Sequence, residues 1–163
     1  MKEGKFLVTG NPVCIIVSEM DTQEARRAFG LKPSNRTIFV TGGSGGAKSI
    51  NTVVDRIKNE LFERNFNLIW QTGKHWDGET EVSYEYKERM VIQRFFDQEQ
   101  MSLAYNAADF AVVRCGAMTL AELAVVGLPA ILLPFPFAAE GHQEANARSI
   151  EAAGGGMMIL IKI

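Results

Sequence analysis

Residues 109–146 read DFAVVRCGAMTLAELAVVGLPAILLPFPFAAEGHQEAN, and this stretch decides the fold. Its opening, Asp109 to Val113, is a mostly apolar run typical of a buried strand. The chain then turns at Gly116 into a segment with helical apolar spacing, including Leu120 and Leu123. Such a helix start carries unpaired backbone N–H groups and the positive end of the helix dipole. The pattern therefore predicts a seat for phosphate at this turn.

Polar side chains flank this turn on both sides. Glu122 lies one turn inside the expected helix, where its carboxylate has the geometry to accept hydrogen bonds from two neighbouring hydroxyls of a ribose. After a second strand over residues 130–133, a Pro-Phe-Pro-Phe loop leads to His142, Gln143 and Asn146 on the first turns of the next helix. We expect these side chains to face the same crevice.

The same side chains also have ordinary structural explanations. Thr119 and Glu122 match the Ser/Thr-x-x-Glu capping box, in which both side chains merely satisfy the helix start. Arg114 either balances the charge of a diphosphate or pairs with an acid inside the fold. Gln143 and Asn146 are residues that are most often solvated on a helix surface.

A glycine-rich loop repeats the strand, turn and helix pattern earlier in the chain. The strand expected at Arg36–Thr41 runs directly into Gly42-Gly43-Ser44-Gly45-Gly46, and a helix is expected from about residue 47 to residue 64. Glycines let the backbone approach a ligand closely and Ser44 adds a hydroxyl, so the loop favours phosphate contact. The alternative is a tight turn that needs positive φ. The loop matches neither the Gly-x-Gly-x-x-Gly dinucleotide fingerprint nor a Walker loop.

The remaining pattern predicts alternating strands and helices. Further strands are expected at 66–72, 90–95, 130–133 and 157–163, with helices at 21–29, 101–107 and 142–153 and a helical or irregular segment at 82–88. This alternation implies right-handed crossovers and an α/β fold, a Rossmann-like doubly wound parallel sheet. Ligands of such sheets bind at the carboxyl ends of the strands, where the glycine loop and the Gly116 turn both lie.

The composition is that of an ordinary soluble globular protein with one domain. The chain has 163 residues, of which 47% are apolar and 22% charged, and a formal charge of -2. The 17 Lys and Arg are matched by 19 Asp and Glu without runs, which argues against a nucleic-acid partner. We find no secretion signal, and prolines interrupt the uncharged stretch 123–139, so we expect a cytoplasmic protein without a spanning helix.

Metal and disulfide chemistry have little support in the sequence. Cys14 and Cys115 are too few for a disulfide framework and lack metal-ligand neighbours. His75, Asp77 and Glu79 cluster in a polar stretch, but no helix or hairpin spacing gives them a coordination geometry. We therefore expect neither a metal nor a cofactor.

Three blocks together resemble the donor-binding half of the MurG glycosyltransferase family. They are Thr9-Gly10-Asn11-Pro12-Val13, Gly42-Gly43-Ser44-Gly45-Gly46-Ala47 and the stretch from Arg114 to Asn146, and they follow the family's order. That family moves N-acetylglucosamine from UDP-N-acetylglucosamine (UDP-GlcNAc) to the muramyl unit of lipid I in peptidoglycan synthesis. The resemblance implies one half of a GT-B glycosyltransferase. Residues 1–17 would be the remnant of an interdomain linker and first strand, and residues 18–163 the nucleotide-sugar donor-binding domain, with the acceptor domain absent and C-terminal helices truncated.

The resemblance also assigns donor contacts. Glu122 matches the family's ribose-binding glutamate, Gln143 and Asn146 match contacts to N-acetylglucosamine hydroxyls, and the backbone of Phe96 would present an N–H and a C=O to uracil. The alternative for Phe96 is a core aromatic. The expected donor-binding residues are Gly43, Ser44, Gly45, Phe96, Arg114, Gly116, Ala117, Met118, Thr119, Glu122, His142, Gln143 and Asn146. The sequence departs from the family at Cys14, where arginine is usual, and at Gly45, where glutamine is usual.

The implied reaction is displacement at the anomeric carbon of UDP-GlcNAc with UDP leaving. Backbone donors of the glycine loop and of residues 117–119 would stabilise the charge that grows on the diphosphate. The resemblance places the general base in the absent acceptor domain, so we expect no catalytic residue in this chain. The chain would bind UDP or UDP-GlcNAc, meet lipid I only through the missing domain, and transfer sugar poorly or not at all.

The resemblance also implies binding partners, and two other functions stay open. We expect the fragment to self-associate through an under-covered sheet face or edge, and the full-length enzyme to be peripheral at the inner face of the cell membrane. One alternative is the donor subunit of a two-chain UDP-GlcNAc transferase. The other is a non-catalytic nucleotide-binding Rossmann module or an epimerase-like protein.

Overall fold

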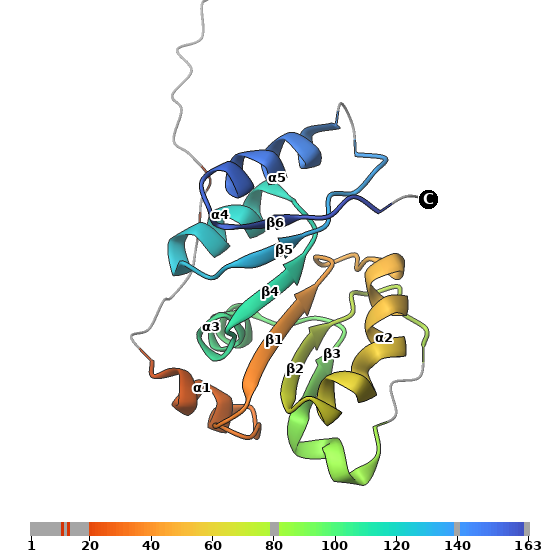
Figure 1. Ribbon diagram of the computed structural model, residues 1–163, viewed down its shortest axis with the longest axis vertical. Helices are drawn as coiled ribbons and strands as arrows, with labels where there is room; N and C mark the ends of the chain where they lie inside the picture. Colours follow the sequence, from red (N-terminus) through yellow and green to blue (C-terminus); the bar gives the residue numbers. More distant parts are fainter. Residues whose placement is uncertain (1–10, 12, 14–19, 79–81, 139–140, 162–163) are drawn as a thin grey trace, which may run out of the picture.

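The computed structural model describes residues 11, 13, 20–78, 82–138 and 141–161. Within these residues six parallel strands form one sheet in the order β3-β2-β1-β4-β5-β6 (Figure 1). This is the strand order of the doubly wound dinucleotide-binding folds, so the predicted α/β architecture is confirmed. The strands are β1 (Arg36–Thr41), β2 (Phe66–Gln71), β3 (Met90–Gln93), β4 (Phe110–Val113), β5 (Ala130–Leu132) and β6 (Gly156–Met158).

The helices begin and end close to the predicted positions. Local signals explain where helices start. At the start of α1, the Asp21 carboxylate accepts a hydrogen bond from the Glu24 N–H. The predicted start of the third helix at Met101 was late, because Asp97 and Gln100 form a capping box that begins the helix at residue 98. The helices are α1 (Thr22–Ala28), α2 (Lys48–Glu63), α3 (Gln98–Ala107), α4 (Ala117–Val126) and α5 (His142–Ala152), with a 3₁₀ helix, η1 (Tyr84–Arg89). The predicted last strand, 157–163, is shorter than expected, since β6 ends at residue 158.

The sheet separates two apolar cores because successive strand residues point to opposite faces. Phe39 and Ile69 belong to the core under α1, α3, α4 and α5. Ile38, Val40 and Trp70 belong to the core under α2. Figure 1 shows α2 on one face and the other four α-helices on the opposite face.

The face under α2 is only partly enclosed. Beside that helix, apolar residues of β1, β4 and β5 line a hollow of about 370 Å³. On the helix itself, Val53 and Ile57 are 53% and 38% exposed. Among the described residues this sheet face is therefore under-covered, as expected, while self-association through it stays a prediction.

Several predicted features lie outside the described residues. They include Cys14, Glu79 and most of the block from Thr9 to Val13, although the Asn11 amide donates to the Ala117 carbonyl at 3.4 Å. The described part of the chain contains no helix that is long and apolar enough to span a bilayer.

Candidate functional site

The two glycine turns meet at the carboxyl edge of the sheet. Thr41 at the end of β1 pairs with Val113 at the end of β4, and the strand order reverses between these two strands. Crevices at such reversals are the usual ligand sites of doubly wound sheets. Helices α2 and α4 both start here, and their N-cap residues, Ala47 and Gly116, make no side-chain cap hydrogen bond. Both helix starts therefore present N–H groups without a capping side chain.

A cleft of about 380 Å³ lies between these two turns. Ser44 from the glycine loop and Glu122 from α4 both line it, as the sequence predicted. The segment after β3 and helix α3 complete the walls. The lining residues are Thr41, Gly43, Ser44, Gln71, Phe95, Phe96, Asp97, Gln98, Met101, Ser102, Tyr105, Met118, Thr119 and Glu122.

Gln71, which sequence reasoning missed, joins two walls of this cleft. Its Nε2 donates to Thr41 Oγ1 at 3.0 Å, and the Gly43 N–H donates to the same oxygen at 3.0 Å. Gln71 Oε1 accepts the Phe96 N–H at 2.9 Å. These bonds connect the glycine loop to the segment after β3 through two buried side chains. A glutamine at the end of a buried strand was the available signal, because a buried amide needs such partners.

Phe96 has a buried ring and a backbone N–H that already has a partner. Its ring is 1% exposed and lies 6.0 Å from the Phe29 ring and 6.3 Å from the Phe39 ring, so the core-aromatic interpretation of the ring is confirmed. Its backbone N–H is already donated to Gln71. A base that used this N–H would have to share or displace that bond, and the predicted contact with uracil stays a prediction.

Glu122 is held by a second residue that the sequence did not reveal. The Tyr105 hydroxyl donates to Glu122 Oε2 at 2.7 Å. The predicted capping box of Thr119 and Glu122 is wrong, because Gly116 is the N-cap and Thr119 stands at the third position of α4. The Glu122 carboxylate accepts a hydrogen bond from Tyr105 and does not cap the helix start.

Arg114 is bound by carbonyl and hydroxyl oxygens, and its predicted role in balancing the charge of a diphosphate stays a prediction. Its guanidinium donates to the carbonyls of Leu133 and Pro134, both at 3.0 Å, and to Ser49 Oγ at 2.7 Å. No acid of the described residues pairs with Arg114, so that interpretation is wrong. Partial burial lowers the pKa of this guanidinium. The guanidinium carbon of Arg114, Cζ, also lies 5.5 Å from the centre of the Phe135 ring. Arg114 ties the chain after β5 to the start of α2.

Gln143 and Asn146 hold the Gly116 turn from α5. Gln143 Oε1 accepts the N–H groups of Cys115 at 3.2 Å and Phe135 at 3.0 Å. Asn146 Nδ2 donates to the Cys115 carbonyl at 3.3 Å. These contacts show a structural use for both residues, and their predicted contacts to a sugar stay predictions. Burial raises the pKa of the enclosed Cys115 thiol to about 11.

Some of the predicted site residues line the first cleft, and others lie around it. A second hollow of about 370 Å³ is lined by Gly42, Gly46, Ala47, Lys48, Ser49, Arg114, Phe135 and Gln143. Ala117 and Asn146 line a groove between α4 and α5. Gly45, Gly116 and the exposed His142 lie outside the first cleft. Over the described residues, no group of three or more His, Cys, Asp or Glu side chains is placed to hold a metal ion.

Comparison with solved structures defines the class of protein. MurG from Acinetobacter baumannii matches with a TM-score of 0.65 and 25% identity, covering 95% of this chain and 44% of that one. The glycosyltransferase SnogD from Streptomyces nogalater matches with a TM-score of 0.60 over 81% of this chain and 33% of its own, at 13% identity, which shows the fold alone. The chain has the Rossmann-like fold of one half of a GT-B glycosyltransferase.

Comparison of sequences narrows this class to a family. The chain belongs to glycosyltransferase family 28, whose C-terminal domain matches residues 37–162. A relative from Salinibacter ruber is 39% identical over 155 residues, which are 94% of this chain and 41% of the relative. One from Acetivibrio thermocellus is 37% identical, covering 98% of this chain and 44% of its own. Both are named UDP-N-acetylglucosamine–N-acetylmuramyl-(pentapeptide) pyrophosphoryl-undecaprenol N-acetylglucosamine transferase. The chain thus spans less than half the length of these relatives.

Proposed function

We propose that this chain is the donor-binding half of a transferase that moves N-acetylglucosamine from UDP-GlcNAc to the muramyl unit of lipid I. The observation that carries the proposal is the single cleft that Ser44 and Glu122 share between two helix starts. Those starts suit a diphosphate, and a carboxylate one turn further along α4 suits the adjoining ribose. The names of the relatives support the choice of donor and acceptor.

The two hollows suggest how the donor lies. The glycine loop borders both, since Gly43 and Ser44 line the first and Gly42 and Gly46 line the second. In the proposal, uridine occupies the first cleft with its ribose at Glu122. The diphosphate crosses the glycine loop, and the sugar extends towards the second hollow.

The chemistry in this proposal is electrostatic. Backbone N–H groups at the starts of α2 and α4 stabilise the charge that grows on the departing UDP, so the reaction needs no metal or cofactor. The base that activates the acceptor hydroxyl comes from outside this chain. The two carboxylates that line the cleft in the described part of the chain already accept hydrogen bonds, Glu122 from the Tyr105 hydroxyl and Asp97 from the Gln100 N–H. In the proposal neither of them acts as that base.

Lipid I carries an undecaprenyl anchor, so its transferase must work beside a membrane. We therefore place the full-length enzyme at the inner membrane surface as a peripheral protein. Contact with lipid I would be made through the partner half of the enzyme. Flotation of the full-length protein with anionic vesicles, compared with this chain alone, tests that division.

Calorimetry with UDP-GlcNAc, UDP-glucose and ADP tests the proposed donor. UDP-GlcNAc should bind most tightly, and Glu122→Gln should weaken UDP binding about 10- to 100-fold, because a hydrogen bond to a charged group contributes about 1.5–3 kcal/mol. Glu63→Gln at the far, exposed end of α2 is the matched control and should change nothing. Equal binding of ADP and UDP, or full UDP binding by Glu122→Gln, would contradict the proposal. Sugar transfer by this chain alone would contradict the half-enzyme.

A further inference from the structure

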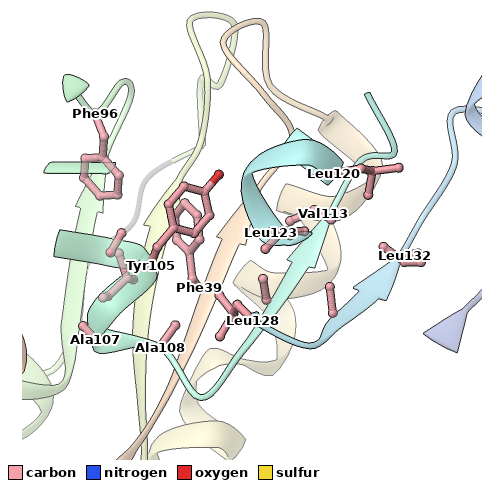
Figure 2. Close-up of a cluster of buried hydrophobic side chains, with 14 of the residues drawn as sticks. Phe39, Phe96, Tyr105, Ala107, Ala108, Val113, Leu120, Leu123, Leu128 and Leu132 are labelled. Carbon is pink, nitrogen blue, oxygen red and sulfur yellow. The ribbon is translucent and has the colours of Figure 1, made fainter. Parts of the chain in front are cut away.

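Tyr105 connects the hydrophobic core to the cleft. It lies on α3, is 3% exposed, and donates its hydroxyl to Glu122 Oε2 at 2.7 Å. Figure 2 shows the labelled ring among the buried side chains, with its hydroxyl directed towards α4. The bond therefore joins two helices across one wall of the cleft.

Rigid neighbours fix the position of this hydroxyl. The Tyr105 ring packs edge-on against the Phe39 ring, with centroids 5.4 Å apart and planes at 88°. Phe39 is fully buried in the central strand β1. Aromatic side chains have few rotatable bonds, so a ring packed in this way points its hydroxyl in one direction.

Tyr105 remains a proton donor under working conditions. Burial raises the pKa of its phenol above the usual range, and the hydrogen bond and negative charge of Glu122 raise it further. The contact is therefore an O–H donating to a carboxylate, which is stronger than a bond between neutral groups. One carboxylate oxygen of Glu122 is held before any ligand arrives.

We propose that Tyr105 is a positioning residue that orients Glu122 towards the 2′,3′-diol of a nucleotide ribose. The inference rests on the proposed function, because it assigns the diol to Glu122. A carboxylate that is already oriented loses less rotational freedom when it binds. Without the hydroxyl, Glu122 keeps its place on α4 and its charge but becomes free to rotate. Tyr105 thereby sets the preference of the cleft for ribonucleotides with both hydroxyls.

The test compares Tyr105→Phe with wild type using two ligands, UDP and 2′,3′-dideoxy-UDP. Wild type should prefer UDP about tenfold or more, because only UDP offers hydroxyls to Glu122. Tyr105→Phe should weaken UDP binding about three- to tenfold and leave dideoxy-UDP binding unchanged, so the preference falls. Tyr84→Phe makes the same chemical change on a side chain that is 86% exposed and should alter neither affinity.

The outcomes separate this inference from the proposed function. If wild type binds neither ligand, the proposed function fails and the inference fails with it. If wild type prefers UDP and Tyr105→Phe keeps the full preference, the positioning role is wrong while the proposed function stands. A merely structural role would weaken both ligands equally, which would also overturn the inference.

A measurement that keeps the Tyr105 hydroxyl covers the case in which Tyr105→Phe does not fold. 3-Fluorotyrosine is incorporated at all three tyrosines, and the Tyr105 ¹⁹F resonance is assigned by elimination with Tyr84→Phe and Tyr86→Phe. Saturating UDP should move this resonance more than saturating dideoxy-UDP does. Equal shifts with both ligands, or no shift, would overturn the role of Tyr105.

Discussion

The two turns beside the cleft differ in whether the fold itself requires their glycine. In the glycine loop, Gly46 has φ +78°, and a Cβ there would lie 2.2 Å from the Thr72 carbonyl oxygen. At the other turn, Gly116 has φ -66° and ψ 144°, and a Cβ there would meet no atom within 4 Å. The protein's own packing thus requires glycine at the first position and leaves the second unexplained.

The turns are also held in different ways. The glycine loop packs backbone to backbone against the residues after β2, where a Cβ added at Gly73 would lie 2.2 Å from the Gly46 backbone. The Gly116 turn is held by side chains, since Gln143 and Asn146 bind the backbone of Cys115. Open space beside an uncapped helix start suits a ligand, so we predict that Gly46 serves the fold and that Gly116 leaves room for the bound nucleotide.

The largest effect is expected from Gly46→Ala. An alanine at this φ costs about 1–2 kcal/mol, and the overlap with Thr72 adds about 1–3 kcal/mol. The melting temperature should therefore fall by about 10 °C, at roughly 2–4 °C for each kcal/mol. Thermal unfolding measures it, with Gly45→Ala as the control because a Cβ at Gly45 meets nothing within 4 Å. Equal stability of the two variants would show that packing does not require Gly46.

A smaller loss is expected from Gln143→Leu. It removes the acceptor of two backbone N–H groups, which should cost about 1–3 kcal/mol in chemical denaturation. Gln143→Glu retains an acceptor oxygen and should keep its stability. If Gln143→Glu weakens UDP-GlcNAc but not UDP, the residue also contacts the sugar. A fully stable Gln143→Leu would mean that the turn does not depend on this side chain.

The smallest change in stability is expected from Gly116→Val. Its backbone angles and open surroundings accept a side chain, so the loss should stay within about 1 kcal/mol. UDP affinity should nevertheless fall at least about tenfold, because the isopropyl group would occupy the space beside the start of α4. Calorimetry measures the affinity and thermal melting the fold. Unchanged UDP binding would remove Gly116 from the site.

The architecture was predictable because its signals are local. The run from Arg36 into five residues of glycine and serine, and the run from Asp109 to Gly116, each specify strand, turn and helix within a few residues. Parallel pairing then brings their carboxyl ends together, which placed Ser44 and Glu122 in one cleft.

The side-chain partners were not predictable, because they depend on packing between distant elements. Tyr105 has the apolar spacing of a core residue, and nothing in the sequence shows that its hydroxyl reaches Glu122. Arg114 donates a hydrogen bond to Ser49, which lies 65 positions away in the sequence. The alternative of a capping box is wrong for a local reason, because the backbone at Gly116 starts the helix before Thr119.

A crystal structure of this chain with UDP tests the central claim most directly. The account predicts the diphosphate between Ser44 and the Ala117 N–H, with a ribose hydroxyl about 3 Å from the Glu122 carboxylate. Tyr105 should still donate to the same carboxylate. A nucleotide bound elsewhere, for example in the groove between α4 and α5, with no contact to Glu122, would contradict the account.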